Sequence, residues 1–190
     1  MDWTITKYHS DQNTIEVLLL HEPMENILLG MVSSPILPNN IALVIDYNLD
    51  SDGDIAGIGY NHDGTNPQIH MIPEIAEHLK KGTDEAKLIL FHEIGHYANK
   101  DYLSSKSNKD YGYDKLRVDA TEKGYVKESE LTADDFAAEY IGKDTIINGL
   151  HQLLLRTKES CSRYPESSYV AFAIKEIELR ILHQLSKQST

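Results

Sequence analysis

His92, Glu93 and His96 form an HExxH sequence, whose residue types and spacing suit metal-assisted hydrolysis. On a helix, side chains four residues apart lie on one face, so both imidazoles can bind a single ion. Zinc binds such nitrogens at about 2.0–2.1 Å. Glu93 would lie beside the ion, within reach of a bound water, where it could act as a general base. The motif therefore predicts a catalytic site with one Zn²⁺ per chain.

A catalytic zinc ion of this kind needs a third protein ligand. The extended pattern HExxHxxGxxH would require a glycine and a histidine where this chain has Asn99 and Tyr102, so that type of site is excluded. The candidate is Glu130, which shares a helical face with Asp134 four residues later. Metal-bound histidines usually donate their second N–H to a carboxylate, and Asp134 could accept that hydrogen bond. Two histidines and one carboxylate favour zinc among hydrolases and would also suit iron.

Two predicted helices must bring these residues together. Thr83 is a suitable N-cap for the first helix, which continues from Ala86 to Asn99. The second covers residues 128–141 and stops at Gly142. The intervening segment, 102–127, lacks sustained periodicity, and we expect a long loop of a length that is usually functional or disordered. Whether this loop controls access to the site stays open. Further helices are expected over 74–81, 145–158 and 166–187.

Residues 1–72 favour a small, mostly antiparallel sheet with hairpins. We expect strands over 3–8, 40–49, 55–60 and 68–72, and a helix over 11–21 capped by Ser10. Residues 50–54, Asp-Ser-Asp-Gly-Asp, are typical of a turn and lack the later residues of an EF-hand calcium loop. The fold class is therefore α+β, as a single domain over 1–190. Its parts are the sheet (1–72), the zinc-site helices (83–142) and the C-terminal helices (143–190).

The charge distribution restricts the partners. The net charge is −12, and the segment from Tyr8 to Leu79 contains eleven acidic residues but no lysine or arginine. Such a surface repels phosphate backbones, so we expect no nucleic-acid partner. Edge strands beside a protease site can hold extended substrates by strand addition. If the acidic segment supplies that edge, the substrate is a basic peptide or protein segment.

Cysteine use and hydropathy bear on location. The single cysteine, Cys161, cannot form an internal disulfide, which fits a reducing compartment. We expect neither an export signal nor a membrane-spanning helix, and hence a cytoplasmic protein without a membrane partner. The apolar C-terminal helices suit either a core or a dimer interface, so the oligomeric state stays open.

The sequence HEIGH, followed by ELTADDFAAEYIGKD, resembles the gluzincin zinc metallopeptidases, in which the third ligand is the Glu of an ExxxD helix. The second run is most similar to soluble relatives of the CAAX prenyl protease type. It is also close to repressor-cleaving metallopeptidases of mobile elements, which often have Asn at the position of Asp134. The resemblance covers about residues 83–155 and implies a zincin-like domain. It implies these roles: His92, His96 and Glu130 as zinc ligands, Glu93 as general base, and Asp134 as the residue that orients a histidine.

The activity implied by the resemblance is that of an endopeptidase, which hydrolyses a peptide bond in a protein substrate with a zinc-activated water. Gluzincins generally supply a Tyr, His or Arg to stabilise the oxyanion. The candidates are Tyr113, Tyr125, His151 and Arg163, of which we select His151. Two alternatives stay open. One is a regulatory or binding protein that keeps the zinc site without hydrolytic activity, and the other is a hydrolase of a non-peptide amide.

Overall fold

The structure, a computed structural model, describes residues 2–25, 27–49, 55–61, 63–101, 113–163 and 168–187. These residues contain six strands and six helices. The strands are β1 (Trp3–His9), β2 (Thr14–Met24), β3 (Leu28–Ser33), β4 (Ile41–Ile45), β5 (Ala56–Gly59) and β6 (Gln68–Met71). The helices are α1 (Pro73–Lys81), α2 (Asp84–Ala98), α4 (Tyr113–Glu122), α5 (Glu128–Ile141), α6 (Lys143–Arg163) and α7 (Ser168–Ser186).

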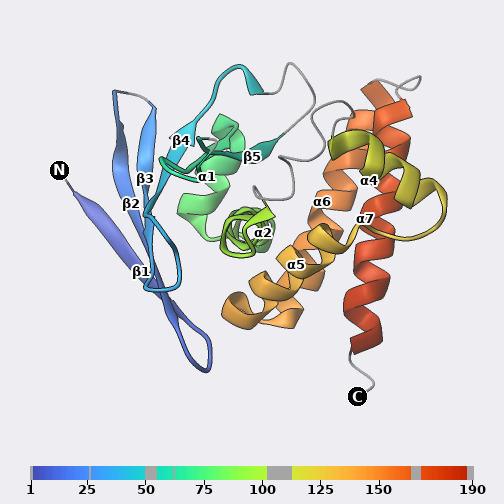
Figure 1. Ribbon diagram of the computed structural model, residues 1–190. Helices are drawn as coiled ribbons and strands as arrows, with labels where there is room; N and C mark the ends of the chain where they lie inside the picture. The colour runs from blue at the N-terminus through green and yellow to red at the C-terminus, as the bar shows by residue number, and fades with distance from the viewer. Residues whose placement is uncertain are drawn as a thin grey trace.

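The strands form one mixed sheet in the order β1-β2-β3-β4-β6-β5. Strands β4 and β6 run parallel, and the other neighbouring pairs are antiparallel. Figure 1 shows the sheet on one side of α2, with α5, α6 and α7 on the other. The predicted α+β class and the mostly antiparallel sheet are therefore confirmed.

The expected helix over 11–21 is wrong, because this segment belongs to strand β2. Ser10 does not cap a helix: its N–H donates to the carbonyl of Asn13, and its Oγ accepts from the N–H of Asn13, which closes a tight turn. After the turn, Ile15 and Val17 alternate into the core while the strand pairs with β1 and β3. Pairing on both sides outweighs a weak capping signal. Strand β3 was not predicted.

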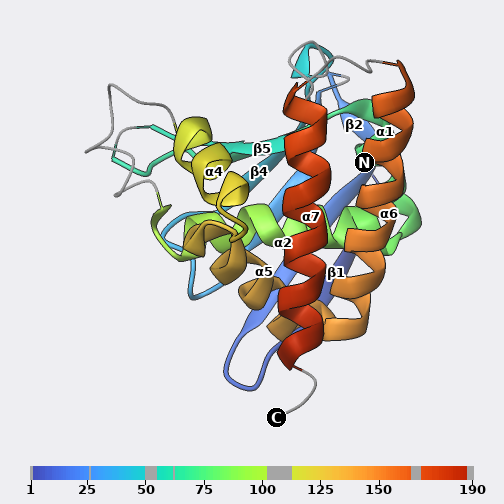
Figure 2. The ribbon, with the colours of Figure 1, turned by 90° about the vertical axis from the view of Figure 1, so that its right-hand side faces the viewer.

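The expected strand over 55–60 exists as β5, but its pairing differs from a simple hairpin with 40–49. Strand β5 pairs with β6, and β6 lies between β5 and β4. Consequently β5 is an edge strand, and it packs beside α2 (Figure 2). The predicted turn at 50–54 lies outside the described residues.

The segment 102–127 is only partly the loop that we expected. Residues 102–112 lie outside the described part of the chain, but α4 occupies 113–122. Helix α4 packs on α7, where the guanidinium of Arg117 lies 5.8 Å from the ring centre of Phe172. A ten-residue helix that packs on the C-terminal part of the fold thus lies within the segment predicted as a loop.

Helix α2 lies in the centre of the molecule and therefore positions the HExxH residues rigidly. Phe91, Ile94 and Tyr97 are fully buried. The ring of Phe91 meets Tyr8 of β1 edge-on at 4.7 Å and stacks on Tyr140 of α5 at 5.9 Å. A helix buried on nearly all sides must be apolar on nearly all sides, which explains the run Leu88–Phe91. Among the described helices, none is long and apolar enough to cross a membrane.

Candidate metal centre

Helix α2 begins as the sequence predicts. Thr83 is the N-cap, and its hydroxyl accepts a hydrogen bond from the N–H of Ala86. Asp84 and Glu85 lie in the first turn, where the helix dipole favours acidic groups. This start sets the rotation of α2, so that His92 and His96 face α5.

Close packing between α2 and α5 depends on Gly95. A Cβ at this position would lie 2.9 Å from the Cα of Ala133 and 3.0 Å from its carbonyl oxygen. Real Cβ atoms are essentially never closer than 3.0 Å to another heavy atom. The glycine therefore lets the two helices approach closely, and the same crossing carries Glu130, one turn before Ala133, toward the histidines.

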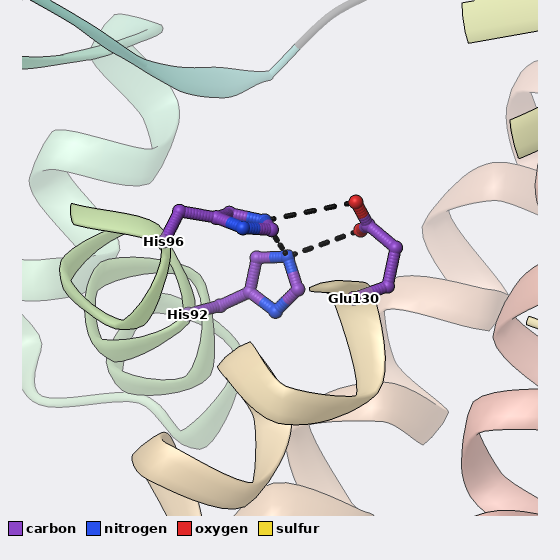
Figure 3. A group of neighbouring side chains, drawn as sticks. All are labelled: His92, His96 and Glu130. Carbon is purple, nitrogen blue, oxygen red and sulfur yellow. Dashed lines mark hydrogen bonds and ion pairs between the residues drawn. The ribbon is translucent and has the colours of Figure 1, made fainter. Parts of the chain in front are cut away.

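His92, His96 and Glu130 form a compact group whose polar atoms could hold a metal ion (Figure 3). The two Nε2 atoms are 3.0 Å apart. The Glu130 carboxylate lies 3.3 Å from Nε2 of His92 and 3.7 Å from Nε2 of His96. The side chains of these three residues are 8%, 11% and 2% exposed. The structure thus brings together the three residues that the sequence predicted as metal ligands.

The spacing of these atoms fits a four-coordinate zinc ion. With bonds of about 2.0–2.1 Å, tetrahedral coordination places ligand atoms about 3.3–3.4 Å apart. The observed separations, from 3.0 to 3.7 Å, lie on either side of that value, with Oε2 of Glu130 facing His92 and Oε1 facing His96. Two imidazoles and one carboxylate are also a common donor set for catalytic zinc. Both the distances and the chemistry of the donors therefore fit the ion.

A carboxylate lies behind each histidine. Nδ1 of His92 is 2.8 Å from Oδ1 of Asp134, and Nδ1 of His96 is 2.7 Å from Oδ2 of Asp101. Because an ionised carboxylate only accepts hydrogen bonds, each Nδ1 carries the hydrogen. The lone pair of each neutral ring is then on Nε2, and the two lone pairs face one another across 3.0 Å. Such an arrangement calls for a cation or a proton between the rings.

The ionisable groups of the centre are strongly coupled. Burial raises the pKa of Asp134, but the charge of Arg180 and hydrogen bonds from His92 and Arg180 outweigh it and hold the pKa at about 2. Burial also raises the pKa of Glu130, yet His92 and the charge of Arg117 bring it well below its usual value. Burial and Arg180 lower the pKa of His92, whereas Asp134 and Glu130 raise it to about 9. Metal and protons must therefore compete at His92, since a ligating imidazole has to be neutral.

The sequence did not predict four contributors to this centre: Asp101, Arg117, Glu176 and Arg180. Asp101 follows His96 by only five residues, so proximity to the motif was a usable signal. Glu176 and Arg180 are one turn apart on α7 and almost fully buried, at 1% and 5% exposure. Nothing in the local sequence of α7 marks these two charges as partners of residues 40 to 60 positions earlier.

Glu93, the predicted general base, is half-buried, while its neighbours Phe91 and Ile94 are fully buried. The Glu93 side chain therefore keeps access to solvent.

The predicted oxyanion residue, His151, is exposed on α6 and is not part of the metal-binding group. Gly149, two residues earlier, lies against Asp84 and Leu88 near the start of α2 rather than against the histidines. Tyr125 is also exposed, at 53%, while the side chains of Tyr113 and Arg163 lie outside the described residues. Of the two candidates whose side chains are described, neither His151 nor Tyr125 belongs to the metal-binding group.

Comparison with protein-family models, curated proteins and solved structures found no match for this chain. The resemblance to gluzincins therefore depends on the motifs themselves, and the geometry of the centre has to carry any functional conclusion.

Proposed function

We propose that this protein is a zinc-dependent endopeptidase of the gluzincin type, with a zincin-like fold and a protein substrate. One observation carries the proposal. His92 and His96, each fixed by a carboxylate at Nδ1, direct Nε2 toward Glu130 at distances that fit zinc, with Glu93 next to them on the same helix. A closed structural site would need a fourth protein ligand, and the described residues supply a group of three.

Each residue of the proposed mechanism has one role. His92, His96 and Glu130 would hold the ion, which supplies Lewis-acid activation of water and of the scissile carbonyl. Glu93 takes a proton from water and later delivers it to the leaving amine. Asp134 and Asp101 keep the two imidazoles in the tautomer that has a free Nε2.

Strand β5 supports an extended peptide as the substrate. It is an edge strand beside α2, and the ring of Tyr60, directly after it, lies 6.3 Å from that of Tyr97 on α2. The hydroxyl of Tyr97 donates to the carbonyl of Gly64, which ties the β5–β6 connection to the metal-binding helix. A peptide paired with β5 would run beside the metal centre, as strand addition requires. Since the segment from Tyr8 to Leu79 has no lysine or arginine, we expect basic peptides to bind best.

The substitution Glu93→Gln tests the proposal. The variant should keep its zinc, because Glu93 is not a ligand, and it should lose cleavage by at least about 100-fold, which is the lower range for general-base catalysis. Glu139→Gln is the matched control, since Glu139 is an exposed glutamate on α5. Cleavage of unstructured proteins and of a peptide library should be followed by mass spectrometry, and zinc content should be measured on the same samples.

The outcomes separate the candidate functions. If Glu93→Gln cleaves as fast as the wild type, Glu93 is not the base and the mechanism fails. If zinc-loaded wild-type protein cleaves no protein or peptide but hydrolyses small amides, the substrate class is wrong. If it hydrolyses nothing, the protein is a binding protein with a zinc site.

A further inference from the structure

Helix α7 supplies a buried arginine behind the metal group, and the proposed mechanism does not use it. Arg180 is 5% exposed, and two of its nitrogens donate hydrogen bonds to the carboxylate of Asp134. Nε lies 2.8 Å from Oδ2, and Nη2 lies 2.6 Å from Oδ1. Such a two-pronged pair fixes both the position and the plane of the carboxylate.

The ion pair between Arg180 and Asp134 determines which nitrogen of His92 carries the hydrogen. Oδ1 of Asp134 accepts from Nδ1 of His92 at 2.8 Å, while Nη2 of Arg180 lies only 3.1 Å from the same nitrogen. If Nη2 donated to Nδ1, the ring hydrogen would sit on Nε2 and block a metal. Instead, the hydrogen on Nδ1 of His92 and a hydrogen on Nη2 of Arg180 both go to Oδ1 of Asp134. Nε2 of His92 therefore keeps its lone pair. The orientation of the guanidinium therefore decides which nitrogen of His92 can bind the ion.

The same helix supports Glu130. One turn before Arg180, Glu176 accepts from Nε of Arg117 at 2.8 Å, and Nη2 of Arg117 lies 3.7 Å from Oε2 of Glu130. Arg117 belongs to α4 and Glu130 to α5, so α7 connects two elements around the centre. Two ligands of the candidate ion, His92 and Glu130, thus depend on side chains that α7 holds in place.

We infer that Arg180 is a positioning residue of the metal centre, which acts through Asp134 to keep Nε2 of His92 available to the ion. This inference rests on the metal site of the proposed function but not on its protease activity. It makes the C-terminal helix part of the metal centre, although the motifs of that centre end at Asp134.

Four variants of Arg180 and Asp134 test the inference. Arg180→Met removes the guanidinium and keeps much of the volume, and Arg180→Lys keeps the charge but cannot form the two-pronged pair. We expect about 10- to 100-fold weaker zinc binding for Arg180→Met, the range for partners of metal ligands, and a smaller loss for Arg180→Lys. If Arg180 acts through Asp134, the double variant Asp134→Asn/Arg180→Met should bind zinc no more weakly than Asp134→Asn alone.

Arg156, on α6, offers a matched control because it contacts the central helix α2 away from the metal group. Its guanidinium contacts the buried Glu85 at the start of α2 at 2.6 and 3.0 Å and the exposed Glu74 of α1 at 3.0 Å, and within the described part of the chain it makes no ion pair with the metal group. Arg156→Met should therefore lower the melting temperature while zinc affinity stays within about twofold of the wild type, since outer partners of the ligands are unchanged. A general effect of losing an arginine that is ion-paired to a buried carboxylate would weaken zinc binding in both variants alike.

The experiment measures zinc affinity by competition with a chromophoric chelator, and the visible spectrum of the Co²⁺-loaded protein. We expect Arg180→Met and Arg180→Lys to alter the Co²⁺ spectrum and Arg156→Met to leave it unchanged. Folded Arg180 variants with wild-type affinity and spectrum would overturn the inference; if Arg180→Met does not fold, Arg180→Lys and the double variant decide. Wild-type protein that binds neither metal would overturn both this inference and the proposed function, whereas a normal metal centre without proteolysis would overturn only the function.

Discussion

The crossing of α2 and α5 at Gly95 is the part of the site most sensitive to a small perturbation. Gly95→Ala adds a single methyl group that would lie 2.9 Å from the Cα of Ala133. An ordinary contact begins at 3.4 Å, so α5 has to move by about 0.5 Å. Backbone atoms cannot rotate away as a flexible side chain can, and the movement therefore reaches Glu130, one turn earlier on the same helix.

Two effects of this substitution on stability partly cancel. Overpacking a tight contact costs about 1–3 kcal/mol, while replacing glycine by alanine inside a helix contributes about 0.5–1 kcal/mol. The free energy of unfolding should then fall by about 0–2.5 kcal/mol. Metal binding is the more sensitive quantity, because metal–ligand distances tolerate only about 0.2 Å. A displacement of about 0.5 Å at Glu130 should weaken zinc binding at least about tenfold, equivalent to about 1.4 kcal/mol.

Gly149→Ala is the control for the Gly95 variant. Gly149 brings α6 against the start of α2, where a Cβ would lie 2.7 Å from the carbonyl oxygen of Asp84 and 2.8 Å from Cβ of Leu88. The steric strain is at least as large, but we expect a shift of α6 to relieve it, and α6 carries none of the three ligands. Urea unfolding with a chelator present should show a loss of stability in this variant too, while chelator competition should show unchanged zinc affinity. If Gly95→Ala binds zinc as tightly as Gly149→Ala, the reasoning is refuted.

Three further predictions concern the charges of the protein. In metal-free protein, the pKa of Asp134 is about 2 instead of 3.8. The ionised carboxylate therefore contributes about 2 kcal/mol to the free energy of unfolding; this contribution is complete above pH 3.8 and is lost as the pH falls through 2. The difference in unfolding free energy between wild type and Asp134→Asn should therefore shrink from pH 5 to pH 2, and a constant difference would contradict the assignment. Asp101→Ala should weaken zinc binding about tenfold in chelator competition, because His96 loses the acceptor at Nδ1; unchanged affinity would exclude that role. Cleavage of lysine-rich peptides should slow as salt is raised, since salt screens attraction to the acidic surface; acidic peptides cut equally fast at low salt would rule out the expected preference.

The local part of the site was predictable from the sequence because its signals are short-range. Thr83 and the acids after it fix the start of α2, and spacings of four residues place His92 with His96 and Glu130 with Asp134 on common faces. The structure brings three of these residues into one group, with Asp134 behind His92.

The remainder depends on tertiary contacts that a linear pattern does not contain. Residues 14–21 form a strand because they pair with β1 on one side and with β3 on the other. The pairing of β5 with β6, rather than with β4, is also a tertiary contact. Arg180 is 46 residues from Asp134, and only the packing of α7 on the other helices brings the two together. Helix α4 likewise takes its place from contacts with α7.

The most direct test of the account is the metal content of purified protein by mass spectrometry, with wild type and Glu130→Ala measured side by side. We predict about one zinc per chain in the wild type and a large loss in the variant, because Glu130 supplies one of three ligands. Wild-type protein without metal after zinc has been offered would contradict the metal centre. Full zinc in Glu130→Ala would show that another side chain completes the site.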